Sequence, residues 1–236
     1  MKLLQTITSW FQPGGIFFPC PCAICGGRLA VGEEVICADC NCSLTRTRQS
    51  AHPEDNVMAR RFWLRADVKR CASFVTHNPH AQSGNIVYAL KYGAHPEYGR
   101  WMGRVMAMEM GVDGFFDGVD VIVPVSLAKV RMRQRGYNQS EEIATGISEV
   151  TGLPVLTGVV ARDTFVKSQT SLTPGERYDN VAGAFRLVDG DAVRGRHVLL
   201  VDDIVTTGAT MTAVANVLAD AGDVTVSIAS WGMAGV

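Results

Sequence analysis

The sequence lacks several features that would assign its 236 residues to a familiar class of protein. No apolar run approaches the roughly 18 residues that a membrane-spanning helix needs, so we expect no membrane span. Lys2 and several apolar residues lie near the N-terminus, but they form no uninterrupted apolar region and no small-residue cleavage site. They do not have the pattern of a signal peptide, and we therefore expect a cytoplasmic protein.

Net charge is almost absent, because 22 Lys and Arg residues face 23 Asp and Glu residues for a formal charge of −1. That balance gives no global electrostatic argument for binding nucleic acid. No Gly-Lys pair occurs in the chain, which excludes the G-x-x-x-x-G-K-S/T loop of P-loop nucleotide-binding proteins. An apolar content of 47% is otherwise ordinary for a globular protein.

What the sequence does contain is centred on residues 198–211. Val198 to Val201 are β-favouring apolar residues, typical of a strand that is buried on both faces of a parallel sheet. Asp202 and Asp203 follow this strand, and a turn of small residues comes next. An apolar run from Met211 to Ala221 then predicts a helix.

This order suits a ligand that carries a diol beside a phosphate. Ligands of open α/β sheets bind at the carboxyl ends of the strands, and adjacent carboxylates accept hydrogen bonds from a vicinal diol such as that of ribose. Backbone N–H groups at a helix N-terminus bind phosphate, and here they belong to Thr206, Thr207, Gly208, Ala209 and Thr210. The pattern predicts a ribose 5-phosphate site. The alternative is a buried strand with an acidic turn and no ligand.

Six of the seven cysteines lie within the first 42 residues. Four of them form the pattern C-x2-C-x11-C-x2-C, namely Cys22, Cys25, Cys37 and Cys40. Each C-x-x-C turn directs two thiolates at one metal, so the spacing predicts a structural zinc site with no open position. A disulfide framework is disfavoured without a secretory signal, and a redox C-x-x-C is the other alternative. Cys20 and Cys42 are left over as possible replacement ligands.

Residues 44–70 hold seven arginines and lysines against three acidic residues, with Phe62 and Trp63 interleaved. Such a segment can contact a nucleic-acid backbone, although a solvated linker or helix face is the simpler interpretation. The change in composition predicts two domains. Residues 1–65 would form an N-terminal helix and zinc-binding module with a basic linker, and residues 66–236 would form the second domain.

Strands and helices alternate along the second domain, which predicts a right-handed parallel α/β sheet. We expect strands at 72–76, 121–125, 155–160, 184–188, 198–201 and 224–229. We expect helices at 81–92, 97–110, 140–150 and 211–221. The polar stretch 162–185 is expected to be a long loop, either a lid or a disordered segment.

A second basic cluster follows the predicted strand 121–125, with Lys129, Arg131, Arg133 and Arg135. Arg131 and Arg135 share one face if this segment is helical. Arginine side chains bind phosphate oxygens with two parallel hydrogen bonds. The cluster therefore predicts a polyphosphate site, with ordinary surface charge as the alternative.

Together these motifs resemble the ComF family, also called the GntX type, of phosphoribosyltransferase-like proteins. Residues 198–210 match the signature that binds 5-phosphoribosyl 1-diphosphate (PRPP). The N-terminal match is the four-cysteine module. The other matching residues are Leu90-Lys91-Tyr92, Pro124 to Leu127, Arg131 to Gln139, and the loop residues Arg162, Thr164, Gln169, Leu172, Arg177 and Asn180. Ser126 departs from the pattern, because proline is usual there.

The resemblance implies a type I phosphoribosyltransferase-like parallel sheet flanked by helices, preceded by a small four-cysteine zinc-ribbon-like module. It implies that 124–135 bind pyrophosphate, that 162–182 close over the site, and that Thr206 to Thr210 hold the 5-phosphate. It assigns catalytic roles to Asp202, Asp203 and Arg162, and phosphate contacts to Lys91, Arg131 and Arg135. Mg²⁺ would bridge diphosphate and ribose oxygens.

Two functions are open at this point. The first is a transferase that moves the phosphoribosyl group of PRPP to an unidentified acceptor, and the sequence shows no obvious general base. The second is a non-catalytic competence or DNA-uptake factor. In that case the PRPP-type fold, the zinc module and the arginine-rich segment would bind single-stranded DNA or a partner protein of the competence machinery.

Overall fold

The computed structural model describes residues 21–162 and 183–235, and its centre is a parallel sheet. The sheet has four strands in the order β1-β6-β5-β2. Their bounds are β1 Arg70–Thr76, β2 Val121–Pro124, β5 His197–Val205 and β6 Thr225–Met233. All three neighbouring pairs are parallel, as the alternation of strands and helices predicted.

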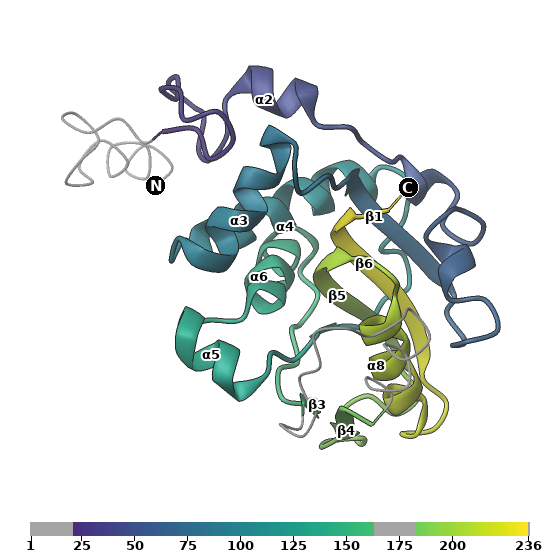
Figure 1. Cartoon of the computed structure of the whole chain (residues 1–236). Helices are drawn as coiled ribbons and strands as arrows, with labels where there is room; N and C mark the ends of the chain where they lie inside the picture. Colours follow the sequence, from purple (N-terminus) through teal and green to yellow (C-terminus); the bar gives the residue numbers. More distant parts are fainter. Residues whose placement is uncertain (1–20, 163–182, 236) are drawn as a thin grey trace, which may run out of the picture.

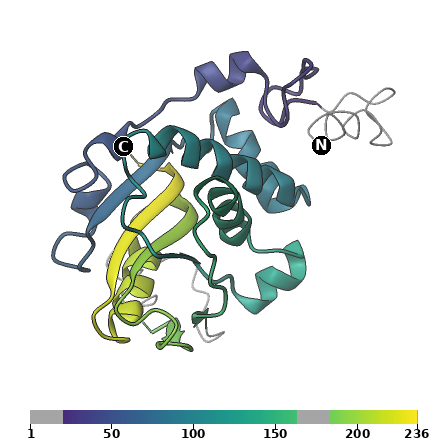
Figure 2. The ribbon, with the colours of Figure 1, turned by 180° about the vertical axis from the view of Figure 1, so that it is seen from behind.

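Helices cover both faces of this sheet (Figures 1 and 2). One face carries α3 Asn85–Tyr92, α4 Pro96–Gly111 and α6 Gln139–Thr151, and the other carries α8 Ala209–Ala219. Alternate residues of β5 enter the two cores, with Leu199 on the α4 and α6 side and Leu200 on the α8 side. Burial on both faces explains the continuous apolar run of this strand.

Shorter elements surround this frame. The helices α2 Ala38–Ser43 and α5 Lys129–Arg135 precede the first strand and follow the second, respectively. Short 3₁₀ helices lie at Gln49–Ala51, Ala59–Arg61 and Gln82–Gly84. No helix within 21–162 or 183–235 is long and apolar enough to cross a membrane.

The strand predicted to end at Val201 is longer than expected. β5 continues to Val205 because its backbone keeps pairing with an equally extended β6, with Asp202 opposite Ser230 and Ile204 opposite Gly232. The two acids therefore lie within the strand rather than after it. The apolar pattern could not predict this extension, because backbone pairing is independent of side-chain polarity.

The expectation of a strand at 155–160 was wrong. Val155 makes a single isolated bridge to Ile122, and the strand begins only at Val160. This β3, Val160–Arg162, pairs antiparallel with β4, Phe185–Leu187, in a separate two-stranded sheet. A short apolar run has the same composition whether it forms a strand of the central sheet or lies beside it, so the sequence does not distinguish the two arrangements.

The basic segment after α2 folds against the sheet. Its residues 45–47 bond the outer edge of β1, where Thr47 N donates to Phe74 O (3.0 Å) and Thr76 N donates to Thr45 O (2.9 Å). Farther along, Phe62 is 1% exposed and belongs to the core on the α8 side. The boundary near residue 65 stays a prediction, and these contacts tie the segment before it to the sheet.

Helices α4 and α6 cross at a point where neither has a side chain. A Cβ on Gly103 would overlap the carbonyl oxygen of Ile143, and one on Gly146 would overlap the carbonyl oxygen of Arg100. The backbones meet this closely because both positions are glycine. The same crossing buries Met102, Met106 and Met110, so the methionine stripe belongs to the core.

We expect Gly103→Ala to lower the free energy of unfolding by about 3 kcal/mol, because a methyl group there forces the two helices apart. Urea denaturation measures the change. Gly111→Ala is the matched control on the same helix, since its nearest neighbour lies at 3.9 Å, and it should be neutral or stabilising by about 1 kcal/mol. Equal effects of the two variants would contradict the close-crossing explanation.

Candidate functional site

The carboxyl end of β5 brings two acids into contact with residues from two helices. Asp203 Oδ2 lies 2.9 Å from Lys91 Nζ of α3, and Asp203 Oδ1 accepts a hydrogen bond from Ile204 N (2.6 Å). Asp202 Oδ1 accepts from Ser140 Oγ of α6 (2.7 Å) and from Asp203 N (2.8 Å). The site predicted from one stretch of sequence is therefore built by three elements.

The ionised form of Asp202 is destabilised by its surroundings. Burial raises the pKa of Asp202 to about 6, and the charge of Asp203 adds to the effect. The hydrogen bonds from Ser140 and the Asp203 amide, together with the charge of Lys91, oppose this shift without cancelling it. Lys91 pairs with Asp203 and not with Asp202, so a further cation or a set of hydroxyl donors would stabilise the ionised pair.

The turn after β5 has the conformation that a phosphate site requires. Gly208 precedes α8 with a φ of 86°, a left-handed conformation that favours glycine. A small cavity of about 40 Å³ is lined by Asp202 and by the run Ile204 to Met211. That space holds about three water molecules, so it fits a group as small as a phosphate.

The basic segment closes one side of this turn. A Cβ on Gly208 would lie 3.2 Å from Cε1 of Phe62, and Arg61 Nη2 donates to the carbonyl oxygens of Ala234 (3.0 Å) and Gly235 (2.9 Å). Asn216 of α8 in turn donates to Arg65 O (3.1 Å). The arginine-rich segment thus packs against the turn and against α8.

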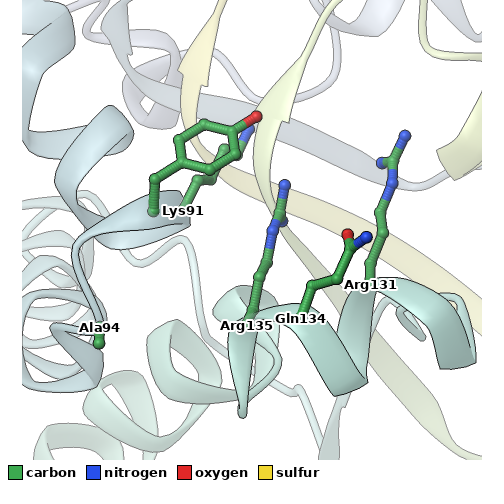
Figure 3. A pocket seen from close by; sticks show the side chains of 6 residues that line it. Lys91, Ala94, Arg131, Gln134 and Arg135 are labelled. Carbon is green, nitrogen blue, oxygen red and sulfur yellow. The ribbon is translucent and has the colours of Figure 1, made fainter.

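A larger pocket lies between α3 and α5. Its volume is about 410 Å³, and its lining residues are Lys91, Tyr92, Ala94, Arg131, Gln134 and Arg135. Arg131, Gln134 and Arg135 project side by side from α5 (Figure 3), which confirms that this segment is helical and that the two arginines share a face. The described residues that line this pocket include no carboxylate, so it suits a polyanion. We call it the cationic pocket.

Arg162 ends β3 at the edge of the described residues. Its guanidinium lies 5.1 Å from the centre of the Phe185 ring. Burial and the neighbouring charge of Arg131 lower the pKa of Arg162, while Asp202 raises it. The fold thus brings Arg162 within electrostatic reach of both the cationic pocket and the acids. The other predicted loop residues, Thr164, Gln169, Leu172, Arg177 and Asn180, lie outside the described residues.

Sequence reasoning missed His77, which follows β1 and is half-buried. Its backbone N–H donates to Met233 O (2.8 Å), and its Cβ lies 2.9 Å from the place a Cβ would occupy on Gly232. Burial and the charge of Lys91 lower the pKa of His77, with Asp203 opposing them. A histidine after a strand has no distinctive sequence pattern, so only the fold reveals it.

Ser140 was also missed, although a signal for it exists. Asn138 caps α6 by accepting a hydrogen bond from Ser140 N (3.2 Å), and it donates to Val125 O (3.0 Å). An asparagine before a helix predicts such a cap. The cap fixes the start of α6 to the end of β2, and this holds the Ser140 hydroxyl at Asp202.

The four predicted cysteines converge on one point. The sulfur atoms of Cys22, Cys25, Cys37 and Cys40 all lie within 4.8 Å of one another, and those of Cys25 and Cys37 are 3.8 Å apart. Tetrahedral zinc with Zn–S bonds of about 2.3 Å requires S···S distances of about 3.8 Å. The cluster fits a structural metal such as zinc. Cys42 lies outside it, and Cys20 lies outside the described residues.

The cluster also stabilises a thiolate, which is the form that binds metal. Burial by itself raises the pKa of Cys22, but backbone hydrogen bonds, including one from Cys37 N (3.3 Å), outweigh it and lower the pKa to about 6. Burial and the neighbouring sulfur atoms raise the pKa of Cys40. A bound cation would favour ionisation of all four thiols.

The chain is similar in sequence to a known domain and to several known proteins. A model of the phosphoribosyl transferase domain matches residues 115–230. The DNA utilization protein YhgH of Shigella flexneri is 29% identical over 218 residues, which cover 88% of this chain and 94% of the relative. Competence protein F of Haemophilus influenzae is 33% identical over 116 residues, or 49% of this chain and 50% of the relative. These homologues and the phosphoribosyl transferase domain support membership of the ComF family.

Solved structures give a looser likeness. Glutamine PRPP amidotransferase from B. subtilis, complexed with ADP and GMP, aligns with a TM-score of 0.37 and 25% identity, covering 55% of this chain and 25% of that chain. Adenine phosphoribosyltransferase from Leishmania tarentolae aligns with a TM-score of 0.38 and 10% identity, covering 81% and 94%.

The serine that departs from the ComF pattern has a structural role here. Ser126 Oγ donates a hydrogen bond to Val160 O, so it ties the segment between β2 and α5 to the first residue of β3. Proline has no hydroxyl group and could not make this contact. The substitution therefore replaces a stiff residue with a specific hydrogen bond.

We expect Cys37→Ser to lose the metal that the wild-type protein holds after expression with added zinc, and to unfold at lower urea concentration. Elemental analysis of the purified proteins measures the metal. Cys42→Ser is the matched control, because Cys42 is exposed and outside the cluster, and it should retain about one equivalent. A full complement of metal in Cys37→Ser would contradict the four-cysteine assignment.

Asp202 also makes stability depend on pH. Its pKa is about 6 in the folded chain and about 3.9 when unfolded. The folded state thus binds more protons between these values, and the free energy of unfolding falls as pH rises from about 4 to about 6. Asp202→Asn keeps both hydrogen bonds and removes the charge. It should stabilise the ligand-free protein by about 2 kcal/mol at pH 7.5 and by little at pH 4.

Thermal denaturation at both pH values measures this difference. Asp220→Asn, at the exposed end of α8, is the control and should change stability by less than about 0.5 kcal/mol. If Asp202→Asn were destabilising at pH 7.5, the carboxylate would be better solvated than its surroundings indicate.

Proposed function

We infer that this chain binds PRPP together with Mg²⁺ and transfers its phosphoribosyl group to an acceptor. The observation that carries the proposal is the placement of two acids, a phosphate-sized turn and a cationic pocket at one end of the sheet. PRPP has one group for each of these features: a diol for the acids, a monophosphate for the turn and a diphosphate for the cationic pocket. The match of residues 115–230 to the phosphoribosyl transferase domain supports the same class of ligand.

In this arrangement the N–H groups and hydroxyls of residues 206–210 hold the 5-phosphate. Asp202 and Asp203 accept hydrogen bonds from the ribose hydroxyls, and the diphosphate extends toward Lys91, Arg131 and Arg135. Mg²⁺ would neutralise part of the diphosphate charge. Lys91, which pairs with Asp203 in the ligand-free chain, would turn toward the diphosphate as the diol takes its place.

Transfer requires that the bond between C1 and the diphosphate oxygen breaks, with the electron pair leaving on pyrophosphate, and that a bond forms between C1 and the nucleophilic atom of the acceptor. The guanidinium groups stabilise that developing negative charge, and the two acids stabilise the positive charge that develops on the ribose ring. Arg162 lies near both groups. His77, whose pKa is lowered by burial and by the charge of Lys91, is the side chain that we propose accepts the proton of the incoming nucleophile.

Calorimetric titration of PRPP with Mg²⁺ into the wild type and into Asp202→Asn/Asp203→Asn tests the proposal. Loss of two charge-assisted hydrogen bonds should weaken binding by about a hundredfold or more. Asp220→Asn/Asp223→Asn makes the same change of charge at exposed positions beyond α8, and it should bind PRPP like the wild type. An absence of heat with the wild type would end the transferase proposal.

The names of the relatives favour a second candidate, a factor in DNA use or competence. The cysteine module and the arginine-rich segment would then contact single-stranded DNA or a partner protein of the competence machinery. Several arginines of that segment are already engaged, since Arg46 pairs with Glu109 (2.8 Å) and Arg60 with Asp55 (2.9 Å). Salt-sensitive DNA binding that survives Asp202→Asn would support this function.

A further inference from the structure

The cationic pocket is larger than its expected ligand. Its volume of about 410 Å³ is within the range of complete small-molecule sites, whereas a diphosphate is only two small tetrahedral groups. Arg131 and Arg135 lie one helical turn apart on α5, so they bracket a span that a diphosphate can bridge. Space beside that span is left for another part of a ligand.

Two exposed tyrosines stand beside this space. Tyr88 and Tyr92 occupy successive turns of α3 and are 68% and 66% exposed. Their ring centres are 4.8 Å apart, and Tyr92 lines the cationic pocket. Neighbouring aromatic rings left in solvent lose the burial that normally stabilises them, so the pair is available to stack on a ligand.

Arg135 joins the tyrosines to the cations. Its guanidinium lies 5.4 Å from the centre of the Tyr92 ring, and its Nη1 donates to Gln139 Oε1 (2.7 Å). The acceptor is a neutral amide, and within 21–162 and 183–235 no carboxylate forms an ion pair with this guanidinium. An aromatic surface and a fixed cation thus meet at one wall of the cationic pocket.

We propose that the cationic pocket binds a nucleoside 5′-diphosphate or triphosphate, with its phosphates at Lys91, Arg131 and Arg135 and its base stacked on Tyr88 and Tyr92. Such a nucleotide occupies the position of the PRPP diphosphate and therefore competes with PRPP. The competition rests on the proposed function, whereas the nucleotide site itself does not. The binding would make use of PRPP depend on the nucleotide concentration.

Single-stranded DNA is the other ligand that combines phosphates with bases. A strand needs cations and aromatic rings spaced along a groove. Here the three cations converge on one pocket, and the two rings contact each other with their planes inclined at 45°, so they form one compact aromatic corner. The arrangement favours a single base joined to a polyphosphate.

Calorimetry with GDP and with inorganic pyrophosphate tests the proposal. GDP should bind the wild type more tightly than pyrophosphate does. Tyr88→Leu/Tyr92→Leu should weaken GDP between about fivefold and about a hundredfold, the range measured for stacking of one base on an aromatic residue. The same variant should weaken pyrophosphate binding by a smaller factor than it weakens GDP binding, because pyrophosphate has no base and loses only the contact of Tyr92 with Arg135. Tyr88→Phe/Tyr92→Phe retains the rings and should restore GDP binding, whereas Arg131→Ala/Arg135→Ala should weaken both ligands.

Each contrary result overturns a defined part of the proposal. Equal affinity for GDP and pyrophosphate in the wild type, or equal losses for both in the leucine variant, would exclude stacking. An oligothymidylate that binds more tightly than GDP through the same tyrosines would assign the surface to a strand. If GDP binds but does not displace bound PRPP, the two sites are separate. If GDP binds and PRPP does not, the proposed function fails while the nucleotide site stands.

Discussion

The pairing of β5 with β6 beyond the apolar part of both strands is the constraint on which the site depends. It keeps Asp202 and Asp203 in extended conformation at the carboxyl edge of the sheet. Because the acids are held rigidly, Lys91 and Ser140 can be placed against them from different helices. A flexible loop carrying the same acids would lose this preorganisation.

Charge is distributed unevenly around that edge. Nearby cations do not fully offset the effect of burial on the acids, because the pKa of Asp202 stays raised. The described residues that line the cationic pocket, in turn, include no carboxylate. Lys91 belongs to both groups, since it pairs with Asp203 and lines the pocket. A ligand that brings hydroxyl donors to the acids and phosphates to the cations relieves both imbalances at once, so the unliganded site is less stable than it could be.

The N-terminal part of the chain is tied to this site through packing. The four-cysteine cluster leads through α2 to a strand-like contact with β1, and the segment that follows places Phe62 against Gly208 of the phosphate-sized turn. Figure 1 shows this course, with α2 above α3 and α4 and the chain descending beside β1. A metal bound by the four cysteines would therefore also fix one end of a segment that borders the candidate site.

Features that depend only on residues close together in the chain could be predicted from the amino-acid sequence. Apolar runs predicted the buried strands, Gly93 and Gly152 marked helix ends, and the spacing of the cysteines predicted their convergence. The acids and the turn of 206–210 were recognisable because the strand, the carboxylates and the helix start are consecutive. Local conformation and local chemistry suffice for such features.

Contacts between residues that are far apart in the chain could be identified only from the folded structure. The contact of Lys91 with Asp203, the burial of Phe62 under the turn, and the position of His77 depend on how β1, α3 and β5 pack together. The length of β5 depends on β6 in the same way. The strand expected at 155–160 does not form because the backbone there pairs with β2 only at Val155, and composition does not reveal how many residues of a segment will pair. These features arise from long-range contacts, for which a single sequence has no periodic signal.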